Sequence, residues 1–242
     1  MKTSKLIALL LAALLMLGLC ACGDKPAPET SAAPASGVSP ETPAPPVVST
    51  EPDDGSFSME KVKAEINSKQ VSDFTESAEP TDYVKITVKD FGEIVVRLRG
   101  DVAPISVQNF KDLVARGFYN GTVFHRVYPG FMIQGGAGEE KLSPIKGEFA
   151  INGVENPLLH VRGVLSMART SVIDSATSQF FLMHADSDFL DGKYAAFGYI
   201  VAGLETVDKI CKIDLGDNER GEHSLPLVDV VMESVAFVTP KQ

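Results

Sequence analysis

The segment FHRVYPGFMIQGG, residues 124–136, carries a single charged side chain among apolar neighbours. This side chain is Arg126, and Phe131, Met132 and Ile133 follow it closely. A guanidinium stays protonated at ordinary pH and presents five N–H donors, so it can stabilise a hydrogen-bond acceptor without acting as a general acid. Because an arginine is rarely buried without a partner, the segment indicates either a functional arginine or a plain surface or salt-bridge arginine.

Three other patterns are weaker candidates for chemistry. The four histidines are scattered without metal-ligand spacing, and HADSD at 184–188 is more typical of an acidic turn than of a metal site. Ser175, His184 and Asp174 are the residue types of a hydrolytic triad, but no nucleophile-elbow motif surrounds the serine. The glycines of QGGAG do not open a helix after a strand, as a dinucleotide-binding loop requires. We therefore expect no metal ion and no cofactor.

The elements that position Arg126 begin near Asp82. Residues 83–98 alternate apolar and polar side chains on both sides of the turn KDFGE, which predicts a β-hairpin. In the next segment, APISVQNFKDLVARGFY, apolar residues recur at helical spacing, Ser106 is a candidate N-cap and Gly117 is the expected end of the helix. The apolar face of this helix consists of Val107, Phe110, Leu113 and Val114.

Short apolar segments dominate the rest of the chain. Five of them predict strands: TVFHRV, FMIQGG, GVLSMA, SQFFLMH and AAFGYI. The segment LETVDKICKI predicts a second helix, in which Cys211 follows Val207 and Ile210 at helical spacing and is expected to be a buried structural thiol. A last strand is predicted at PLVDVVMESVAFV. Many short strands with two helices favour one mainly β domain, a closed antiparallel β-barrel with helical plugs.

The N-terminus has the features of a targeting signal. Lys2 and Lys5 precede the apolar run LIALLLAALLMLGL, and small residues follow. The stretch LCACGD resembles a bacterial lipobox, in which cleavage occurs before a cysteine that receives lipid. On this resemblance Cys22 is the first mature residue, and its lipid anchors the protein to the outside of a bacterial cell membrane. Two alternatives remain: cleavage before Cys20, which places the bulky Leu19 ahead of the cut, and an ordinary secretory signal that leaves Cys22 as a free thiol.

These features divide the chain into four parts. They are a lipoprotein signal peptide at 1–21, a proline-rich tether at 22–57, an accessory segment with a weak helical pattern at 58–81, and the main domain at 82–242. Eight of the fifteen prolines lie between Pro26 and Pro52, so we expect the tether to be extended. Removing Lys2 and Lys5 from the 22 basic residues leaves 20 against 32 acidic ones, a net charge of −12. So acidic a chain is poorly suited to nucleic acid, because phosphate contacts dominate that affinity.

At FHRVYPGFMIQGG the sequence resembles the cyclophilins, a family of peptidyl-prolyl cis/trans isomerases. A second block, GVLSMARTSVIDSATSQFFLMHADSDFLDGKYAAFGYI, is similar to the other half of that family's active-site groove, and the resemblance covers roughly residues 82 to 238. It implies a closed eight-stranded antiparallel β-barrel capped by two α-helices, with Arg126 as the catalytic residue. The substrate-binding residues that it implies are Phe131, Met132, Gln134, Ala168, Arg169, Thr170, Gln179, Phe181, Phe189, Leu190 and Tyr194.

Three positions depart from the pattern of eukaryotic cyclophilins. Phe189 stands where many have a tryptophan, Tyr194 where they have a histidine, and Arg169 where an asparagine is common. A phenyl ring cannot donate the hydrogen bond of an indole, which argues against tight cyclosporin binding. None of the three changes removes Arg126, so the resemblance still predicts an active isomerase.

The sequence therefore predicts a peptidyl-prolyl isomerase that assists the folding of secreted or surface proteins outside the cytoplasmic membrane. Its expected partners are proline-containing polypeptides and, through the N-terminal lipid, the membrane. We expect a monomer that binds no nucleic acid. One alternative is a chaperone or scaffold module that binds proline-containing segments, with incidental catalysis. Another is a structural or adhesive surface lipoprotein without isomerase activity.

Overall fold

The computed structural model describes residues 57–242. Cys22, the expected signal peptide and nearly all of the expected tether lie outside the described residues. The described helices are α1 (Met59–Glu65), α2 (Pro104–Ala115) and α3 (Leu204–Ile210), with 3-10 turns η1 (Val71–Asp73), η2 (Ala150–Asn152) and η3 (Asp188–Leu190). The strands are β1 (Phe74–Glu76), β2 (Tyr83–Val88), β3 (Gly92–Leu98), β4 (Phe124–Tyr128), β5 (Met132–Gly135), β6 (Val164–Met167), β7 (Phe180–Met183), β8 (Ala196–Ala202), β9 (Leu215–Asp217), β10 (His223–Pro226) and β11 (Met232–Pro240). Among these residues no helix is long and apolar enough to span a bilayer.

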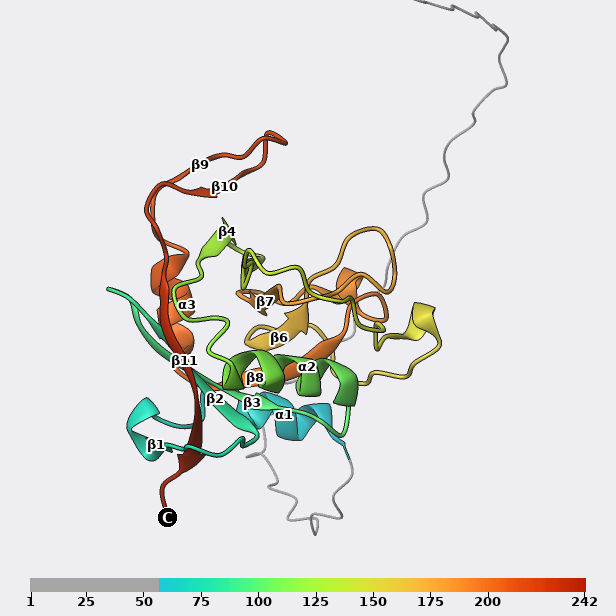
Figure 1. The fold of residues 1–242 in the computed structure, drawn as a ribbon, viewed down its shortest axis with the longest axis vertical. Coiled ribbons are helices and arrows are strands. Elements are labelled where there is room, and N and C mark those ends of the chain that lie inside the picture. The colour runs from blue at the N-terminus through green and yellow to red at the C-terminus, as the bar shows by residue number, and fades with distance from the viewer. Residues whose placement is uncertain (1–56) are drawn as a thin grey trace, which may run out of the picture. The chain divides into compact units, whose positions relative to one another are not determined.

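One sheet of nine strands carries the domain (Figure 1). Its strand order is β1-β11-β2-β3-β8-β6-β7-β5-β4, and neighbouring strands are antiparallel. The predicted first hairpin is confirmed as β2 and β3: Val84 faces Val96, Ile86 faces Ile94, and all four side chains are fully buried. The period-two alternation in the sequence therefore marks the core side of these strands.

The closed eight-stranded barrel expected from the sequence is not confirmed. The sheet has nine strands and its order runs from β1 to β4 without a ladder joining the two ends. The residue before β4 instead meets the residue before β11 through an isolated bridge, between Val123 and Val231. The additional strand is β1, which comes from the accessory segment and pairs with the end of β11.

The region before β11 also differs from the expectation. The apolar pattern predicts a last strand from Pro226, but the strand begins at Met232. Residues 215–226 form a separate hairpin, β9 and β10, which lies beside β4 (Figure 1). The apolar residues Leu227 and Val228 are 62% and 53% exposed, so their composition is typical of a strand while their position is that of a surface connection.

Helix α2 forms with its predicted apolar face buried, but a different residue caps it. The helix begins at Pro104, whose fixed φ suits the first helical position. Ser106 lies inside the first turn and is not the N-cap. The carboxylate of Glu148 accepts hydrogen bonds from the backbone N–H groups of Ile105 (2.9 Å) and Ser106 (2.8 Å) and from the Ser106 hydroxyl (2.6 Å). A buried glutamate from a distant segment thus satisfies amides that the helix leaves free.

The other two helices, α1 and α3, pack against the sheet through buried side chains. Cys211 directly follows α3 and is 8% exposed, as predicted for a structural thiol, and burial raises its pKa to about 12. Helix α1 buries Val62 completely. Its Glu65 carboxylate accepts hydrogen bonds from Arg97 at 2.7 Å and from the hydroxyl of Tyr199. The accessory segment is therefore part of the packed domain.

The sheet separates two apolar clusters. Ile133 of β5 and Phe180 of β7 belong to the cluster that includes residues of α2 and α3. Met132 of β5 and Phe181 of β7 belong to the cluster on the other side, with Val62 of α1. Because side chains alternate along a strand, adjacent residues of β5 and β7 serve opposite faces. The second face is the one that carries the predicted site.

Candidate active site

Strand register places three predicted site residues in one row. Arg126 of β4 faces Gln134 of β5, and Gln134 faces Phe181 of β7. The row continues to Ser166 of β6. Directly opposed residues of neighbouring strands lie on the same face within contact distance. The sheet therefore brings together side chains that are far apart in the sequence.

Arg126 makes polar contacts along two edges of its guanidinium. Its Nε and Nη2 donate to the two carboxylate oxygens of Glu222, in the β9–β10 hairpin, at 2.6 and 2.5 Å. Its Nη1 lies 3.4 Å from Gln134 Oε1 and 4.0 Å from Met132 Sδ, and Gln134 donates to Gln179 Oε1 at 2.9 Å. The salt-bridge interpretation of Arg126 is thus correct for one edge, while the other edge lies among the predicted site residues.

A buried apolar floor lies beside this edge. Met132, Phe181 and Leu190 are 1%, 5% and 6% exposed and belong to one cluster. Ala168 and Tyr194 are partly buried and pack against the same cluster. Such a floor can hold an apolar ring away from water.

A polar triad of His160, Asp191 and Ser166 lies beside the floor, where the ring of His160 stacks on that of Phe181 with centroids 6.0 Å apart. His160 Nδ1 lies 2.9 Å from Asp191 Oδ1, and Nε2 lies 2.9 Å from Ser166 Oγ. Because a carboxylate only accepts, Nδ1 carries the proton and Nε2 accepts from the serine. Burial lowers the pKa of His160, against the opposing effect of Asp191, so the ring is neutral at pH 7. Ser166 is fully buried, and the triad therefore acts as a support for Phe181 rather than as a nucleophilic site.

Aromatic side chains form the rim of the site. The ring of Phe131 lies 5.5 Å from that of Phe189 and 5.9 Å from that of Tyr128, centroid to centroid. Tyr194 meets Phe181 nearly edge-on at 5.9 Å. Phe189 is 56% exposed, so the aromatic surface continues from the buried floor to solvent.

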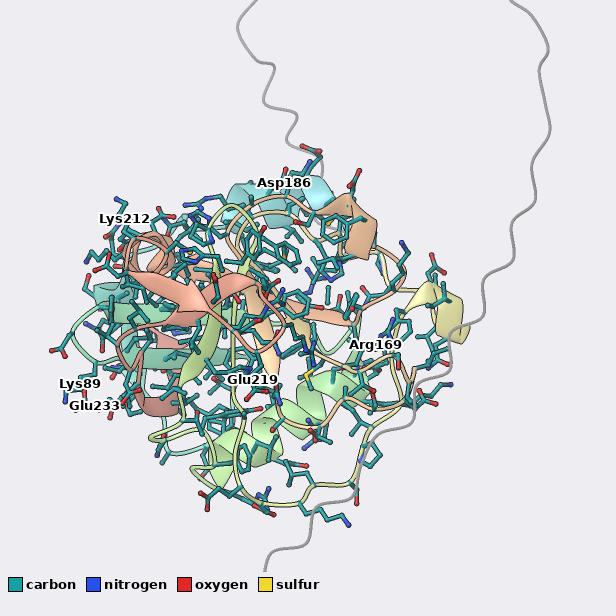
Figure 2. All side chains as sticks on the ribbon, turned by 90° about the horizontal axis from the view of Figure 1, so that it is seen from above. Lys89, Arg169, Asp186, Lys212, Glu219 and Glu233 are labelled. Atoms are coloured by element: carbon teal, nitrogen blue, oxygen red, sulfur yellow. The ribbon has the colours of Figure 1, made fainter. Side chains whose placement is uncertain are left out.

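Three predicted residues, Ala168, Arg169 and Thr170, lie on the loop after β6, and the last two make polar contacts there. Arg169 (labelled in Figure 2) stacks on Tyr194, with its Cζ 4.6 Å from the ring centre, and donates twice to the carbonyl oxygen of Lys193, at 3.0 and 2.8 Å. Thr170 is exposed, and its hydroxyl donates to Ser175 Oγ at 2.8 Å within its own loop. The structure therefore joins Arg169 to the site through Tyr194, whereas the side chain of Thr170 is engaged elsewhere.

The weaker candidates have other partners. Ser175 bonds within its loop, His184 Nδ1 accepts the N–H of Gly130 at 2.8 Å, and Asp174 accepts from Asn152 at 2.7 Å. Across residues 57–242, no three potential ligands are grouped to hold a metal ion. Two open hollows of about 480 and 660 Å³ lie beside residues 118–123 and along α2, and none of the predicted site residues lines them.

Residues 83–235 match the family model described as "Cyclophilin type peptidyl-prolyl cis-trans isomerase/CLD". The chain belongs to this cyclophilin family. The resemblance read from the sequence is thereby confirmed at the level of the family. The mainly β cyclophilin fold and the enzyme class, a peptidyl-prolyl cis-trans isomerase, are confirmed with it.

Bacterial peptidyl-prolyl cis-trans isomerases are among the most similar curated relatives. Peptidyl-prolyl cis-trans isomerase A of Dickeya dadantii is 45% identical over 158 residues, which cover 61% of this chain and 80% of the relative. Peptidyl-prolyl cis-trans isomerase B of Escherichia coli is 43% identical over 159 residues, which cover 60% of this chain and 93% of the relative. A Cryptosporidium parvum cyclophilin, crystallised in the presence of the dipeptide ala-pro, matches with a TM-score of 0.56 and 26% identity over 65% of this chain and 99% of its own.

The sequence did not predict Glu222, the ion-pair partner of Arg126. Hydrogen bonding from Arg126 lowers the pKa of its carboxyl to about 2, with burial opposing this effect, so the pair stays charged at neutral pH. No spacing in the polar segment GDNERGEHS indicates a partner 96 residues away in the sequence. The only available signal was the general rule that an arginine among apolar residues needs a counter-charge.

Proposed function

We propose that this cyclophilin isomerises X–Pro bonds of secreted or surface proteins from a lipid anchor outside the cytoplasmic membrane, with Arg126 as its catalytic residue. What supports the catalytic part is the cross-strand row of Arg126, Gln134 and Phe181, which lines up a donor, an amide and an apolar ring. The proposed location outside the membrane and the lipid anchor are supported by the N-terminal sequence alone.

The reaction is a rotation, and its barrier comes from amide resonance. That barrier is about 18–20 kcal/mol, which gives uncatalysed times of tens to hundreds of seconds. No covalent bond breaks, so the site has to hold the twisted amide better than either planar isomer. As the amide twists, the prolyl nitrogen loses conjugation and becomes an acceptor, and Arg126 Nη1 is the donor that faces the floor of the site.

The required lowering of the barrier is larger than Arg126 can provide alone, so the floor has to contribute as well. Shortening tens of seconds to milliseconds takes about four decades, or roughly 5.5 kcal/mol. A hydrogen bond to a charged group contributes about 1.5–3 kcal/mol. The remainder has to come from Phe131, Met132 and Phe181 enclosing the proline ring in a dry environment, and from Gln134 fixing the carbonyl side.

The test of the catalytic part is an isomerase assay on the purified full chain with a proline-containing peptide. We expect Arg126→Ala to lower kcat/KM by about 10- to 150-fold while the variant still binds the peptide. Wild-type turnover in the variant would remove Arg126 from the mechanism. In cells, the Arg126→Ala strain is compared with a null strain under secretion stress. If the variant has no turnover but its cells tolerate the stress as wild-type cells do, the binding-module alternative is favoured.

The lipid anchor has its own test. Mass spectrometry of the mature protein from membranes should show a lipidated N-terminal Cys22. An unmodified cysteine there, or cleavage before Cys20, would contradict the proposed anchoring at Cys22. Two acyl chains suffice for stable anchoring, since each buried methylene contributes about 0.8 kcal/mol.

A further inference from the structure

The β9–β10 hairpin delivers one carboxylate to the side of Arg126 that faces away from the floor. Glu222 binds the Nε and Nη2 edge in a bidentate ion pair. The side chains of the pair are only 30% and 29% exposed. Paired, fork-to-fork geometry of this kind fixes the orientation of a guanidinium as well as its charge.

The carboxylate is itself held by a network within the hairpin. Glu222 Oε2 accepts from Ser224 Oγ at 2.7 Å and from Asn218 Nδ2 at 3.2 Å, and Ser224 is fully buried. Asn218 Oδ1 in turn accepts the backbone N–H groups of Arg220 (2.9 Å) and Glu222 (3.1 Å). Gly221 takes a φ of +73° in this turn, a conformation that suits glycine. The turn is thus organised around the position of one carboxylate.

The third nitrogen of the guanidinium, Nη1, makes no hydrogen bond to Glu222 and lies on the side of the predicted site. Nη1 of Arg126 has only long contacts, 3.4 Å to Gln134 Oε1 and 4.0 Å to Met132 Sδ. Good N–H···O bonds are about 2.7–3.2 Å long, so this nitrogen is weakly engaged. It is oriented but still able to donate to a bound amide.

We propose that Glu222 is a positioning residue for catalysis: it locks the guanidinium of Arg126 so that Nη1 faces the floor before a substrate arrives. The proposal rests on the catalytic role of Arg126 proposed above. A free arginine side chain samples many rotamers, and because the prolyl nitrogen becomes an acceptor only as the amide twists, the cost of ordering the donor falls on the transition state and not on peptide binding. A preordered donor avoids that cost in the transition state.

The counter-charge acts in the opposite direction, because a carboxylate weakens the positive field at the reacting amide. Two features make orientation the larger effect. The pair is partly exposed, so solvent screens the field of the carboxylate. The carboxylate also occupies the edge away from Met132 and Gln134, so it competes for no donor that the floor uses.

Three variants of the full chain test the proposal, with peptide isomerisation rates and peptide Kd measured by NMR. Glu222→Gln removes the charge and the bidentate pair. Glu222→Asp keeps the charge but draws it back by one methylene. Glu219→Gln (labelled in Figure 2) is the matched control, because it removes the same charge from an exposed position in the same turn.

We expect Glu222→Gln to lower kcat/KM by about 5- to 30-fold, which corresponds to about 1–2 kcal/mol at about 1.4 kcal/mol per decade. Glu222→Asp should fall between this variant and the wild type, Glu219→Gln should match the wild type, and the peptide Kd should stay within about two-fold in all three. The Arg126 Nε–H resonance should shift in Glu222→Gln relative to the wild type, as the fixed pair is lost, and should stay unchanged in Glu219→Gln.

Several results would overturn the proposal. Wild-type turnover in Glu222→Gln would mean that the carboxylate does not position Arg126 for catalysis. Higher turnover would mean that the ion pair inhibits Arg126. Full activity in Glu222→Asp would assign the effect to charge alone. An equal weakening of peptide Kd would point to a structural role of the hairpin. The proposed function has a separate test, the Arg126→Ala assay. It is refuted if the wild type shows no isomerase activity or if Arg126→Ala retains all of it, whatever the Glu222 variants show.

Discussion

Replacing Arg126 by lysine separates the shape of the guanidinium from its charge. Arg126 uses three nitrogens at once: Nε and Nη2 on Glu222, and Nη1 toward Gln134 and Met132. A lysine has a single nitrogen on a flexible stem, so it can pair with Glu222 or face the floor, but not both. The expected loss is one charged hydrogen bond to the twisted amide, about 1.5–3 kcal/mol. This corresponds to about a 10- to 150-fold decrease in kcat/KM.

The assay is peptide isomerisation by Arg126→Lys, with thermal unfolding measured on the same sample. The melting temperature should change little, because the lysine keeps an ion pair with Glu222. Arg116→Lys is the matched control, since Arg116 is an exposed arginine that pairs with Glu140 at 3.1 Å on the surface. If Arg126→Lys retains kcat/KM within about two-fold of the wild type, a point charge is sufficient and the argument from the guanidinium fork is wrong.

Three further predictions concern stability and reactivity. Glu148→Ala should lower the free energy of unfolding by about 3 kcal/mol in urea, because it leaves three donors of the first turn of α2 without their acceptor, whereas the exposed Glu155→Ala should not. The pKa of Glu222 is about 2 in the folded protein and 4.5 ordinarily, so its contribution to stability is complete above pH 4.5 and is lost as the pH falls toward 2. Urea titrations should therefore show that the difference in unfolding free energy between the wild type and Glu222→Gln shrinks over that pH range. Burial raises the pKa of Cys211 to about 12, so mass spectrometry of its peptide should find no alkylation at pH 8 in the native protein and rapid alkylation in urea.

Local sequence patterns predicted most of the strands and helices of the fold. The alternation of residues 83–98 predicted the first hairpin, and the helical spacing of Val107, Phe110 and Leu113 predicted the buried face of α2. These predictions succeed because the period of burial in a strand or helix is set by backbone geometry, which acts over a few residues. The row of Arg126 and Gln134 follows from the same geometry once the two strands are paired.

Partner choice over long distances was not available from the sequence. Ser106 has the side chain of an N-cap, yet Glu148 serves the free amides, because tertiary packing brings a stronger acceptor to the helix end. Apolar composition also predicted strand at Leu227, where the chain is exposed. Glu222 shows the same limitation in the site, since a single carboxylate has no periodicity that would mark its partner.

The glycines after Gln134 explain why the register of the site is secure. A Cβ on Gly135 would stand 2.9 Å from the carbonyl oxygen of Val123, and Gly136 takes a φ of +78°, so neither position readily accepts another residue. A shift of β5 that puts Gln134 in the place of Gly135 would bring a Cβ against Val123 and would place Ile133 opposite Arg126. The motif FHRVYPGFMIQGG therefore holds two parts that depend on each other. Arg126 and Gln134 face each other only in this register, and Gly135 excludes the shift that would replace Gln134 by Ile133.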